Sequence, residues 1–375
     1  MLVSVEDHRI AARRALPRVL YDFVDGGAGA ERTLKRNRAG FDDWRLCPRS
    51  FRSSSKVSLK SELLGSRLNI PILLAPTGAA GLLWPDGEAE AARAAAARGT
   101  VMQVSAGSLL SMEEIASASM GQKWLQLFLY KDRGLTCEFL RRAQAAGYRA
   151  ICVTTDAPVH GRRERDIRNG FSIDQRLTRS TLFDAALHYR WWFRMMGQPK
   201  FAMKNFEGRA DSNMADMAAY IASVLDPDAT WDDLSWLREQ WEGPLVVKGI
   251  LDPADAREAV TRGVDAVQVS NHGGRQLEGA VSTIDALPSI CDAVDGAVPV
   301  LVDGGVTSGV DVLKALALGA SACCIGRAYL WGLAVNGGKG VEAILQILEA
   351  ELRKAMAIGG WRSLDSLDRN AVTRL

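Results

Sequence analysis

Short, uninterrupted apolar runs recur along this chain, and segments with a helical spacing of apolar positions separate them. The runs are rich in Val, Ile, Leu and Ala and do not alternate with polar residues, which is typical of parallel strands covered on both faces. We predict eight such strands, at residues 70–75, 101–105, 123–128, 150–155, 245–248, 266–270, 298–303 and 320–325. Intervening helices are predicted at residues 88–98, 137–146, 253–262 and 309–318.

This alternation of strands and helices predicts the fold class. Eight strand–helix units in roughly 265 residues fit a (β/α)8 barrel, or TIM barrel, whose usual length is about 250 residues. An open, doubly wound α/β sheet is the competing fold, but no predicted strand is followed by the Gly-x-Gly-x-x-Gly loop typical of it. We therefore predict that residues 1–375 form a single barrel domain with a short helical extension at the N-terminus.

One interval, residues 157–230, shows no clear strand–helix pair and is predicted to be a long insertion after the fourth strand. Active sites of such barrels lie on loops at the C-terminal ends of the strands, so the insertion is expected to cover the site. It contains Phe183, Tyr189, Trp191, Trp192, Phe193, Met195, Met196, Phe201 and Phe206, with His188, Arg190, Arg194, Lys200 and Lys204 among them. A basic, aromatic segment such as residues 181–206 is typical of a contact with a membrane interface. A lid that packs on the barrel or on a neighbouring subunit explains the same residues.

Composition narrows the classes of protein to which this chain can belong. Hydrophobic residues make up 47% and charged residues 24% of the chain, as in water-soluble globular proteins, and the net charge of +2 gives no indication of nucleic-acid binding. The six cysteines form neither a Cys-x-x-Cys pair nor a metal-binding spacing, which predicts small core residues in a reducing compartment and no metal site. The charged N-terminal stretch and the lack of any apolar run near the roughly 20 residues of a spanning helix favour a cytoplasmic protein.

Candidate chemistry is concentrated in residues 267–277, where a β-branched run ends in Ser-Asn-His-Gly-Gly-Arg. This pattern places His272 and Arg275 three residues apart at the C-terminal end of a strand, and the two intervening glycines allow a sharp turn. A titratable base beside a fixed cation is what proton removal from an anionic substrate requires. The alternative is an ordinary strand-end turn with a capping histidine.

Other predicted strands also end in residues that could bind a ligand or take part in catalysis. The seventh strand ends in Asp303-Gly304-Gly305 and the eighth in Gly326-Arg327, and the loops at these two positions commonly bind phosphate in this fold. The fifth strand ends at Lys248, a cation that either faces an anionic ring or is solvated. Asp156 follows the fourth strand and could orient His272, and an arginine among residues 162–165 could bind a carboxylate, although a surface salt-bridge cluster explains that charged run equally well.

The segment Ser270-Asn271-His272-Gly273-Gly274-Arg275-Gln276-Leu277 is strongly similar to the signature of the FMN-dependent α-hydroxy-acid oxidising enzymes, which include glycolate oxidase, lactate oxidase and dehydrogenase, and mandelate dehydrogenase. The resemblance covers nearly the whole chain and includes residues 16–22, 75–78, 126–127, 247–249, 303–305 and 314–320. Residues 83–87, 163–166 and 189–191 most resemble the mandelate dehydrogenase branch, which is membrane-associated through the inserted loop. The resemblance implies FMN as cofactor and oxidation of a 2-hydroxy acid to a 2-oxo acid.

The resemblance also implies a role for individual residues. His272 would be the base at the substrate α-carbon with Asp156 holding its imidazole, and Arg163 and Arg275 would bind the substrate carboxylate. Lys248 would lie near the N1/O2 edge of the flavin. The remaining cofactor-binding residues would be Pro76, Thr77, Gly78, Ser105, Gln126, Thr154 and Ser270 around the ring and ribityl chain, and Asp303, Gly304, Gly305, Gly326 and Arg327 around the phosphate. Oxygen, a quinone or a protein would reoxidise the flavin, and the assembly would be a homotetramer, cytoplasmic or peripheral on the inner face of the membrane.

Three residues depart from the family pattern; two of them bear on the substrate, and the third weakens one phosphate contact but leaves Arg327. Phe23 and Phe128 stand where the family has substrate-binding tyrosines, and Thr307 stands where it usually has an arginine. Each lost hydroxyl removes a hydrogen bond of about 1.5–3 kcal/mol where its partner is charged, while a large side chain is stabilised by about 25 cal/mol per Å² of apolar burial. We therefore predict a larger, apolar, mandelate-like 2-hydroxy acid as substrate. The alternatives are oxidation of a C–N bond in an α-amino acid or modified peptide, and a flavin-binding paralogue with little turnover.

Overall fold

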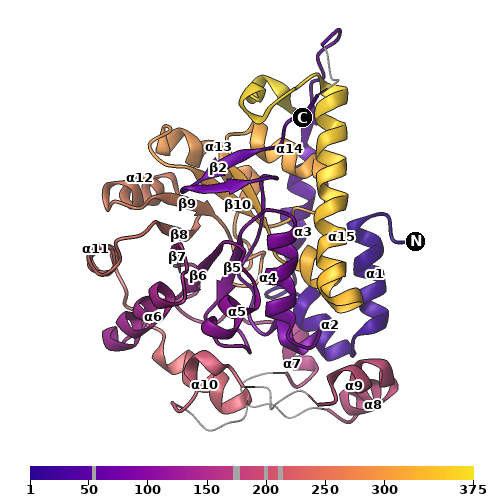
Figure 1. The fold of residues 1–375 in the computed structure, drawn as a ribbon, viewed down its shortest axis with the longest axis vertical. Coiled ribbons are helices and arrows are strands. Elements are labelled where there is room, and N and C mark those ends of the chain that lie inside the picture. The colour runs from indigo at the N-terminus through magenta and orange to yellow at the C-terminus, as the bar shows by residue number, and fades with distance from the viewer. Residues whose placement is uncertain (53–55, 172–177, 198–201, 210–213) are drawn as a thin grey trace.

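The computed structural model describes residues 1–52, 56–171, 178–197, 202–209 and 214–375 (Figure 1). Within these residues, eight parallel strands close into a barrel in the order β10-β11-β4-β5-β6-β7-β8-β9. The strands are β4 (Ile72–Leu74), β5 (Met102–Ser105), β6 (Lys123–Leu127), β7 (Ala150–Thr154), β8 (Leu245–Ile250), β9 (Ala266–Val269), β10 (Val300–Asp303) and β11 (Ala322–Ile325). The predicted (β/α)8 barrel is confirmed, whereas its description as a single domain stays a prediction.

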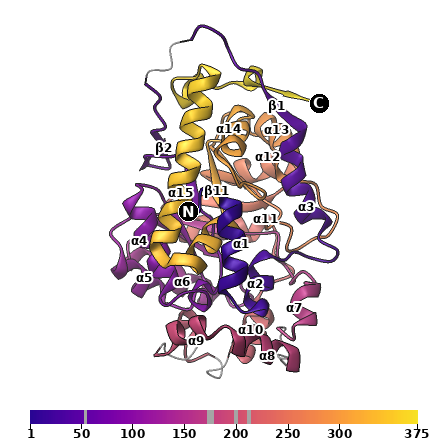
Figure 2. The same ribbon diagram turned by 90° about the vertical axis from the view of Figure 1, so that its right-hand side faces the viewer.

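Helices surround the barrel on its outer side. They are α4 (Gly87–Ala97), α5 (Met112–Ala118), α6 (Arg133–Ala145), α11 (Trp231–Gln240), α12 (Pro253–Thr261), α13 (Thr283–Val294), α14 (Gly309–Ala317) and α15 (Arg327–Gly359). The last of these is kinked at Asn336 and Gly337, whose backbone angles are not helical. It packs lengthwise against α4 and against α1 (Val5–Ala15) at the start of the chain (Figure 2).

The segments before the barrel form the predicted helical extension and a plug. Helices α2 (Arg18–Asp25) and α3 (Arg32–Ala39) follow α1, and β1 (Trp44–Leu46) pairs with β12 (Val372–Arg374) near the C-terminus. The hairpin of β2 (Ser61–Leu63) and β3 (Ser66–Leu68) lies toward the end of the barrel opposite the insertion (Figure 1). Its Leu63 and Leu68 pack on inward-facing barrel residues and close that end.

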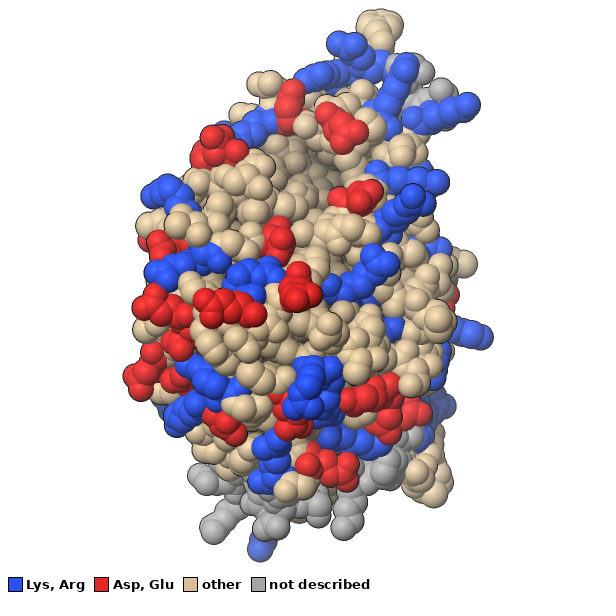
Figure 3. All heavy atoms as spheres, turned by 60° about the vertical axis from the view of Figure 1, so that its left-hand side comes forward, with Lys and Arg blue, Asp and Glu red and all other residues tan. Residues whose placement is uncertain are grey.

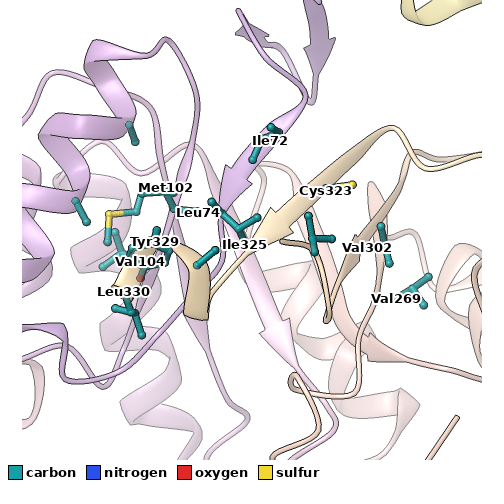
Figure 4. Close-up of a cluster of buried hydrophobic side chains, with 14 of the residues drawn as sticks. Ile72, Leu74, Met102, Val104, Val269, Val302, Cys323, Ile325, Tyr329 and Leu330 are labelled. Atoms are coloured by element: carbon teal, nitrogen blue, oxygen red, sulfur yellow. The ribbon is translucent and has the colours of Figure 1, made fainter. Parts of the chain in front are cut away.

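Side chains on the barrel strands alternate between two apolar layers, as the two-residue period of a strand requires. Outward residues such as Ile72, Leu74, Val302 and Ile325 pack against the helices (Figure 4). Inward residues in the N-terminal half of the strands fill the barrel and include Leu73, Trp124, Ala150, Val246 and Leu301.

Toward the C-terminal ends of the strands, the inward positions change from apolar to polar. Inward residues recur at every second position of a strand. The inward series that contain Trp124, Ala150 and Val246 therefore end with Gln126, Thr154 and Lys248, respectively. Asp303 follows Leu301 in the same way, and all four of these polar residues are buried. The strand alternation therefore turns a hydrophobic barrel into a polar floor at one end.

The insertion between β7 and α11 lies across this polar end, as predicted (Figures 1 and 2). Its helices are α7 (Glu164–Arg168), α8 (Arg179–Leu187), α9 (Tyr189–Met195) and α10 (Met214–Val224). Two of the residues predicted to characterise it, Lys200 and Phe201, lie outside the described residues.

The surface carries no dominant charge on the face shown in Figure 3, where acidic and basic side chains are intermixed. Among the described residues, none of the helices has the length and apolar character needed to cross a bilayer. The same part of the chain contains no group of three His, Cys, Asp or Glu side chains placed to hold a metal ion.

Candidate active site

A cavity of about 1030 Å³ lies at the C-terminal end of the barrel, between the strand ends, the N-terminal helices and the insertion. The predicted site residues that line it are Phe23, Pro76, Thr77, Gly78, Ser105, Gln126, Phe128, Thr154, Arg163, Lys248, His272, Arg275, Asp303, Gly304, Gly305, Gly326 and Arg327. The other two, Asp156 and Ser270, lie directly behind this wall and bond to His272. The structure thus brings all of these residues together from loops far apart in the sequence.

The histidine turn is built from three consecutive residues with left-handed backbone angles. The φ values of His272, Gly273 and Gly274 are +56°, +62° and +73°. Such a conformation is uncommon for a residue with a side chain and often marks a functional site. The Oγ of Ser270 accepts the backbone N–H of His272 at 3.0 Å, and this bond holds the imidazole toward the cavity.

His272 and Asp156 form a hydrogen-bonded pair, with Nδ1 of the imidazole 2.8 Å from Oδ1 of the carboxylate. Burial acts to raise the pKa of Asp156, but the charge of Lys248 and the contacts with His272 outweigh it and lower that pKa to about 2. Burial lowers the pKa of His272 below its usual value; Asp156 opposes this effect, while the charges of Lys248 and Arg163 add to it. At neutral pH the pair is therefore a carboxylate and a neutral imidazole, and its Nε2 is free to accept a proton.

A buried hydrogen-bond network supports the polar floor. Nζ of Lys248 donates to Oγ of Ser270 at 3.0 Å, and that hydroxyl donates to Oδ1 of Asp303 at 2.8 Å. Nε2 of Gln268 donates to the other oxygen of Asp303 at 2.7 Å. Burial acts to lower the pKa of Lys248, but the charges of Asp156 and Asp303 raise it overall, so the lysine remains a fixed cation.

Two arginines face the cavity without an ion pair to a carboxylate in the described residues. Nη1 of Arg275 donates to the carbonyls of Phe23 and Gly26, at 2.7 and 3.0 Å. Nε of Arg163 is shut off from solvent and has no hydrogen-bond partner in the described part of the chain. Burial and the charges of Arg163 and Arg327 lower the pKa of Arg275, whereas Asp166 acts in the opposite direction. An anion bound between these cations would relieve their repulsion.

The predicted phosphate end combines a glycine turn with the start of a helix. Gly305 has a φ of +84°, and a side chain there would collide with the carbonyl of Asn37 on α3. Gly326 precedes α15 and Arg327 is its first residue, so the N-terminus of this helix, an anion-binding position, faces the cavity. Nε, Nη1 and Nη2 of Arg327 all donate to backbone carbonyls, those of Val24, Gly273 and Gly26. Burial lowers the pKa of Arg327 to about 10, which still leaves it cationic at neutral pH.

One further polar group on the floor has no partner. Oε1 of Gln126 accepts from Oγ of Ser105 at 3.1 Å, but its Nε2 is buried without a hydrogen bond in the described residues. Buried donors are rarely left unpaired, so this amide indicates a ligand acceptor above it.

Apolar side chains from the insertion and from α2 cover the opposite side of the cavity. Phe171, Met203, Phe206 and Ile221 line it from the insertion. The ring of Phe171 packs edge-on against Phe23, with 5.2 Å between the ring centroids. The wall opposite the polar floor is therefore aromatic and aliphatic.

Sequence reasoning missed several residues that shape the site. Gln268 could have been found, because it lies two positions before Ser270 and therefore faces the same way. Asp166 is buried, which raises its pKa, although the charges of Arg275 and Arg163 act to lower it. Neither Asp166 nor Phe171 gave a comparable signal, because both lie in a segment without a regular pattern.

The chain matches the model of the family described as FMN-dependent dehydrogenase over residues 12–374. It belongs to that family. It is 43% identical to the L-lactate dehydrogenase of Xanthomonas campestris pv. campestris (strain B100) over 380 residues, which covers 100% of this chain and 98% of that protein.

Solved structures agree with this assignment. The monotopic membrane protein (S)-mandelate dehydrogenase is 37% identical with a TM-score of 0.95, and all of both chains is covered. A Tyr-to-Phe mutant of mandelate oxidase, solved with (S)-mandelic acid, is 37% identical with a TM-score of 0.85 and covers 100% and 99% of the two chains. The protein is thus an oxidoreductase of the family that oxidises 2-hydroxy acids with FMN.

Proposed function

We propose that this member of the family oxidises a 2-hydroxy acid with a large apolar side chain, such as mandelate, to the corresponding 2-oxo acid. The observation that carries the proposal is a neutral imidazole, paired with the Asp156 carboxylate at 2.8 Å, in the same cavity as two arginines that lack a carboxylate partner. A base beside an anion-binding pair is the arrangement needed to deprotonate a substrate whose carboxylate is held in place.

In this proposal each group around the base has one task. Arg163 and Arg275 bind the substrate carboxylate and so orient the α-carbon and its hydroxyl toward His272. Nε2 of His272 accepts one proton of the substrate, from the α-carbon or from its hydroxyl, and the ionised Asp156 stabilises the imidazolium that results; the other hydrogen leaves with or after the two electrons. The apolar insertion residues that line the cavity reduce the access of water to the reacting atoms.

The residues present fit FMN. The unpaired Nε2 of Gln126 would suit a flavin carbonyl, and the cationic Lys248 would stabilise negative charge on a reduced flavin. The Gly305 turn and the N-terminus of α15, with Arg327, suit the phosphate. When bound, FMN supplies the acceptor for the two electrons that leave the substrate.

The apolar wall supports the choice of substrate. Phe23 and Phe128 offer rings without hydroxyls, and the insertion adds further apolar groups around them. Such a pocket stabilises an aryl group by burial but gives a small acid such as glycolate or lactate few contacts. The mandelate oxidase mutant solved with (S)-mandelic acid supports the same class of ligand.

Anaerobic bleaching of the bound flavin tests this function. We expect mandelate to bleach it faster than glycolate or lactate. Bleaching by α-amino acids instead would favour oxidation of a C–N bond. If neither the hydroxy acids nor the amino acids bleach the flavin, a flavin-binding protein with little turnover would be favoured.

We also propose a peripheral contact with a membrane, and with it a quinone as electron acceptor. Trp191 and Met195 of the insertion are buried, but neighbouring residues form an exposed apolar patch. This patch consists of Leu182, Phe183, Leu187, Tyr189, Trp192, Phe193 and Met196. An exposed apolar surface of this size favours contact with a partner such as a membrane. The structurally similar (S)-mandelate dehydrogenase is itself a monotopic membrane protein. The homotetramer and the inner-face location stay predictions.

Co-sedimentation with anionic vesicles tests the membrane contact. Replacing Phe183, Trp192 and Phe193 by Ser should abolish vesicle binding without changing the rate of flavin reduction. Ile358→Ser, at an equally exposed apolar position on α15, serves as the control. Equal binding by both variants, or none by the unmodified protein, would contradict the proposal and favour a soluble acceptor or oxygen.

A further inference from the structure

The two arginines of the proposed carboxylate site come from separate parts of the chain. Arg275 follows β9, whereas Arg163 directly precedes α7 in the insertion. Two guanidinium groups bind one carboxylate well only when their spacing is fixed. The distance between them therefore depends on how the insertion is attached to the rest of the protein.

The turn after α2 holds Arg275. The carbonyls of Phe23 and Gly26 accept from Nη1 of Arg275, and Gly26 also accepts from Nη2 of Arg327 at 2.6 Å. Carbonyls at the C-terminal end of a helix carry partial negative charge and suit such donors. This turn is thus the reference point for one of the two arginines.

Arg163 has no comparable support for its own side chain. Its Nε lacks a hydrogen-bond partner in the described part of the chain, so its position follows from its backbone at the start of α7. Whatever fixes α7 relative to the turn after α2 also fixes Arg163 relative to Arg275.

Arg165, on the first turn of α7, makes that connection. Its Nη2 lies 2.5 Å from Oε2 of Glu31, and its Nη1 lies 3.2 Å from Oδ2 of Asp25 and 3.5 Å from Oδ1 of Asp22. Its Cδ lies close against Gly26 itself. The insertion is therefore attached at the turn that carries Arg275.

The acidic partners of Arg165 are themselves held in place. The side chain of Asp25 is 4% exposed and receives two hydrogen bonds from Arg9, at 2.7 and 3.1 Å. Asp22 accepts from Nδ2 of Asn169 at 2.8 Å, and Glu31 accepts the backbone N–H of Gly27 at 3.1 Å. Burial acts to lower the pKa of Arg165, but the hydrogen bond and charge of Glu31, with the charges of Asp25 and Asp22, raise it overall.

We propose that Arg165 is a positioning residue for substrate binding: by attaching α7 to the turn after α2, it sets the spacing of Arg163 and Arg275. The proposal rests on the carboxylate-binding role given to that pair above. Arg165 does not touch the substrate in this account, and its effect passes through Arg163.

The test measures the affinity of the FMN-loaded, full-length protein for oxalate, from the change in the flavin spectrum. Arg165→Met should raise the Kd for oxalate at least tenfold, and Arg165→Lys should restore part of the loss. Arg168→Met is the matched control, because Arg168 lies on the same helix, is 71% exposed and pairs only with Glu164 among the described residues; its Kd should stay within twofold of that of the unmodified protein.

A second experiment, in the Arg163→Met variant, distinguishes a positioning role of Arg165 from a merely structural one. If Arg165 acts through Arg163, adding Arg165→Met to Arg163→Met should change the Kd less than twofold further, whereas a merely structural role would give a full additional loss. If Arg165→Met does not fold, Glu31→Gln, which weakens one of the three ion pairs, should show a smaller shift in the same direction.

The outcomes distinguish this inference from the proposed function. Normal oxalate binding by the unmodified protein with an unchanged Kd in Arg165→Met, or with additive losses in the double variant, overturns the inference alone. Failure of oxalate to perturb the flavin of the unmodified protein overturns the carboxylate site and this inference with it.

Discussion

The strand-end floor and the insertion that covers it are built on different principles. Lys248, Gln268 and Asp303 on the floor are buried and connected by hydrogen bonds, each on a strand held by two neighbours. In the insertion, Phe183 and Phe193 expose more than two thirds of their surface, 69% and 68%. In the functions proposed above, the barrel supplies the base and the cofactor-binding groups, while the insertion contributes Arg163 and otherwise controls access and location.

The largest expected effect separates these two tasks. His272→Gln should retain FMN but reduce the rate of flavin reduction by mandelate about 10²–10⁴-fold, because the general base is lost. Trp192→Ala, in the exposed part of the insertion, should leave that rate unchanged. Stopped-flow absorbance under anaerobic conditions measures both. Similar losses in the two variants would remove the distinction between floor and insertion.

The carboxylate site lies at the border between the two regions and should give the next largest effect. Arg275→Met and Arg163→Met should each weaken oxalate binding by about 2–5 kcal/mol, the usual cost of losing one charged hydrogen-bond partner from a desolvated site. A variant that binds oxalate with its original affinity would show that its arginine does not face the carboxylate.

The pH dependence sharpens the role of the floor. The pKa of His272 is lowered in the folded protein, and the base works only while its imidazole is neutral. We therefore expect kcat/KM to fall about tenfold per pH unit on the acid side, with an apparent pKa below the usual histidine value of about 6.5. Since the charge of Asp156 raises the pKa of His272, Asp156→Asn should move this limb to lower pH. An acid limb above 6.5 would contradict the assignment.

The smallest expected effect concerns the wall between the two regions. Phe23→Tyr combined with Phe128→Tyr should shift the preference from mandelate toward lactate by about 0.5–1.5 kcal/mol per new hydrogen bond, which is about 2- to 13-fold in relative kcat/KM for each bond. Competition between the two substrates measures the ratio. No shift, or one toward mandelate, would mean that these rings do not contact the substrate.

From the sequence, Lys248 and Asp303 are predicted at strand ends and Gln126 is predicted by the family resemblance, and strand periodicity explains why all three face inward. Once residues 123–128 are read as a strand with Trp124 inward, Gln126 must face inward too, and the same reasoning places Lys248 and Asp303. The pattern around His272 and Arg275 indicated a base beside a cation, and the family resemblance then supplied FMN and singled out Arg163, which periodicity cannot give.

The side-chain contacts of the insertion could not be predicted from the sequence, because tertiary contacts decide which of its residues are buried. Nothing in the local pattern indicates that Trp191 turns inward to donate to the carbonyl of Leu82 while the adjacent Trp192 stays exposed. The attachment of Arg165 to Glu31 likewise joins segments more than a hundred positions apart. Arg327 was predicted at the phosphate end and lines the cavity, but its bonds to three backbone carbonyls follow only from how α2 and the turn after β9 pack around it.

The way the barrel closes constrains how the chain can be made. β4 pairs with β11, and β1 pairs with β12 at the C-terminus. One edge of β4 and the pairing edge of β1 are therefore covered only after the last strands have formed. Pairings between distant segments form slowly, and uncovered strand edges promote association with other chains. During synthesis β4, β5, β6 and β7 can pair with one another, but the outer edge of β4 stays uncovered until β11 has been made, so the incomplete barrel exposes an apolar strand edge to other chains.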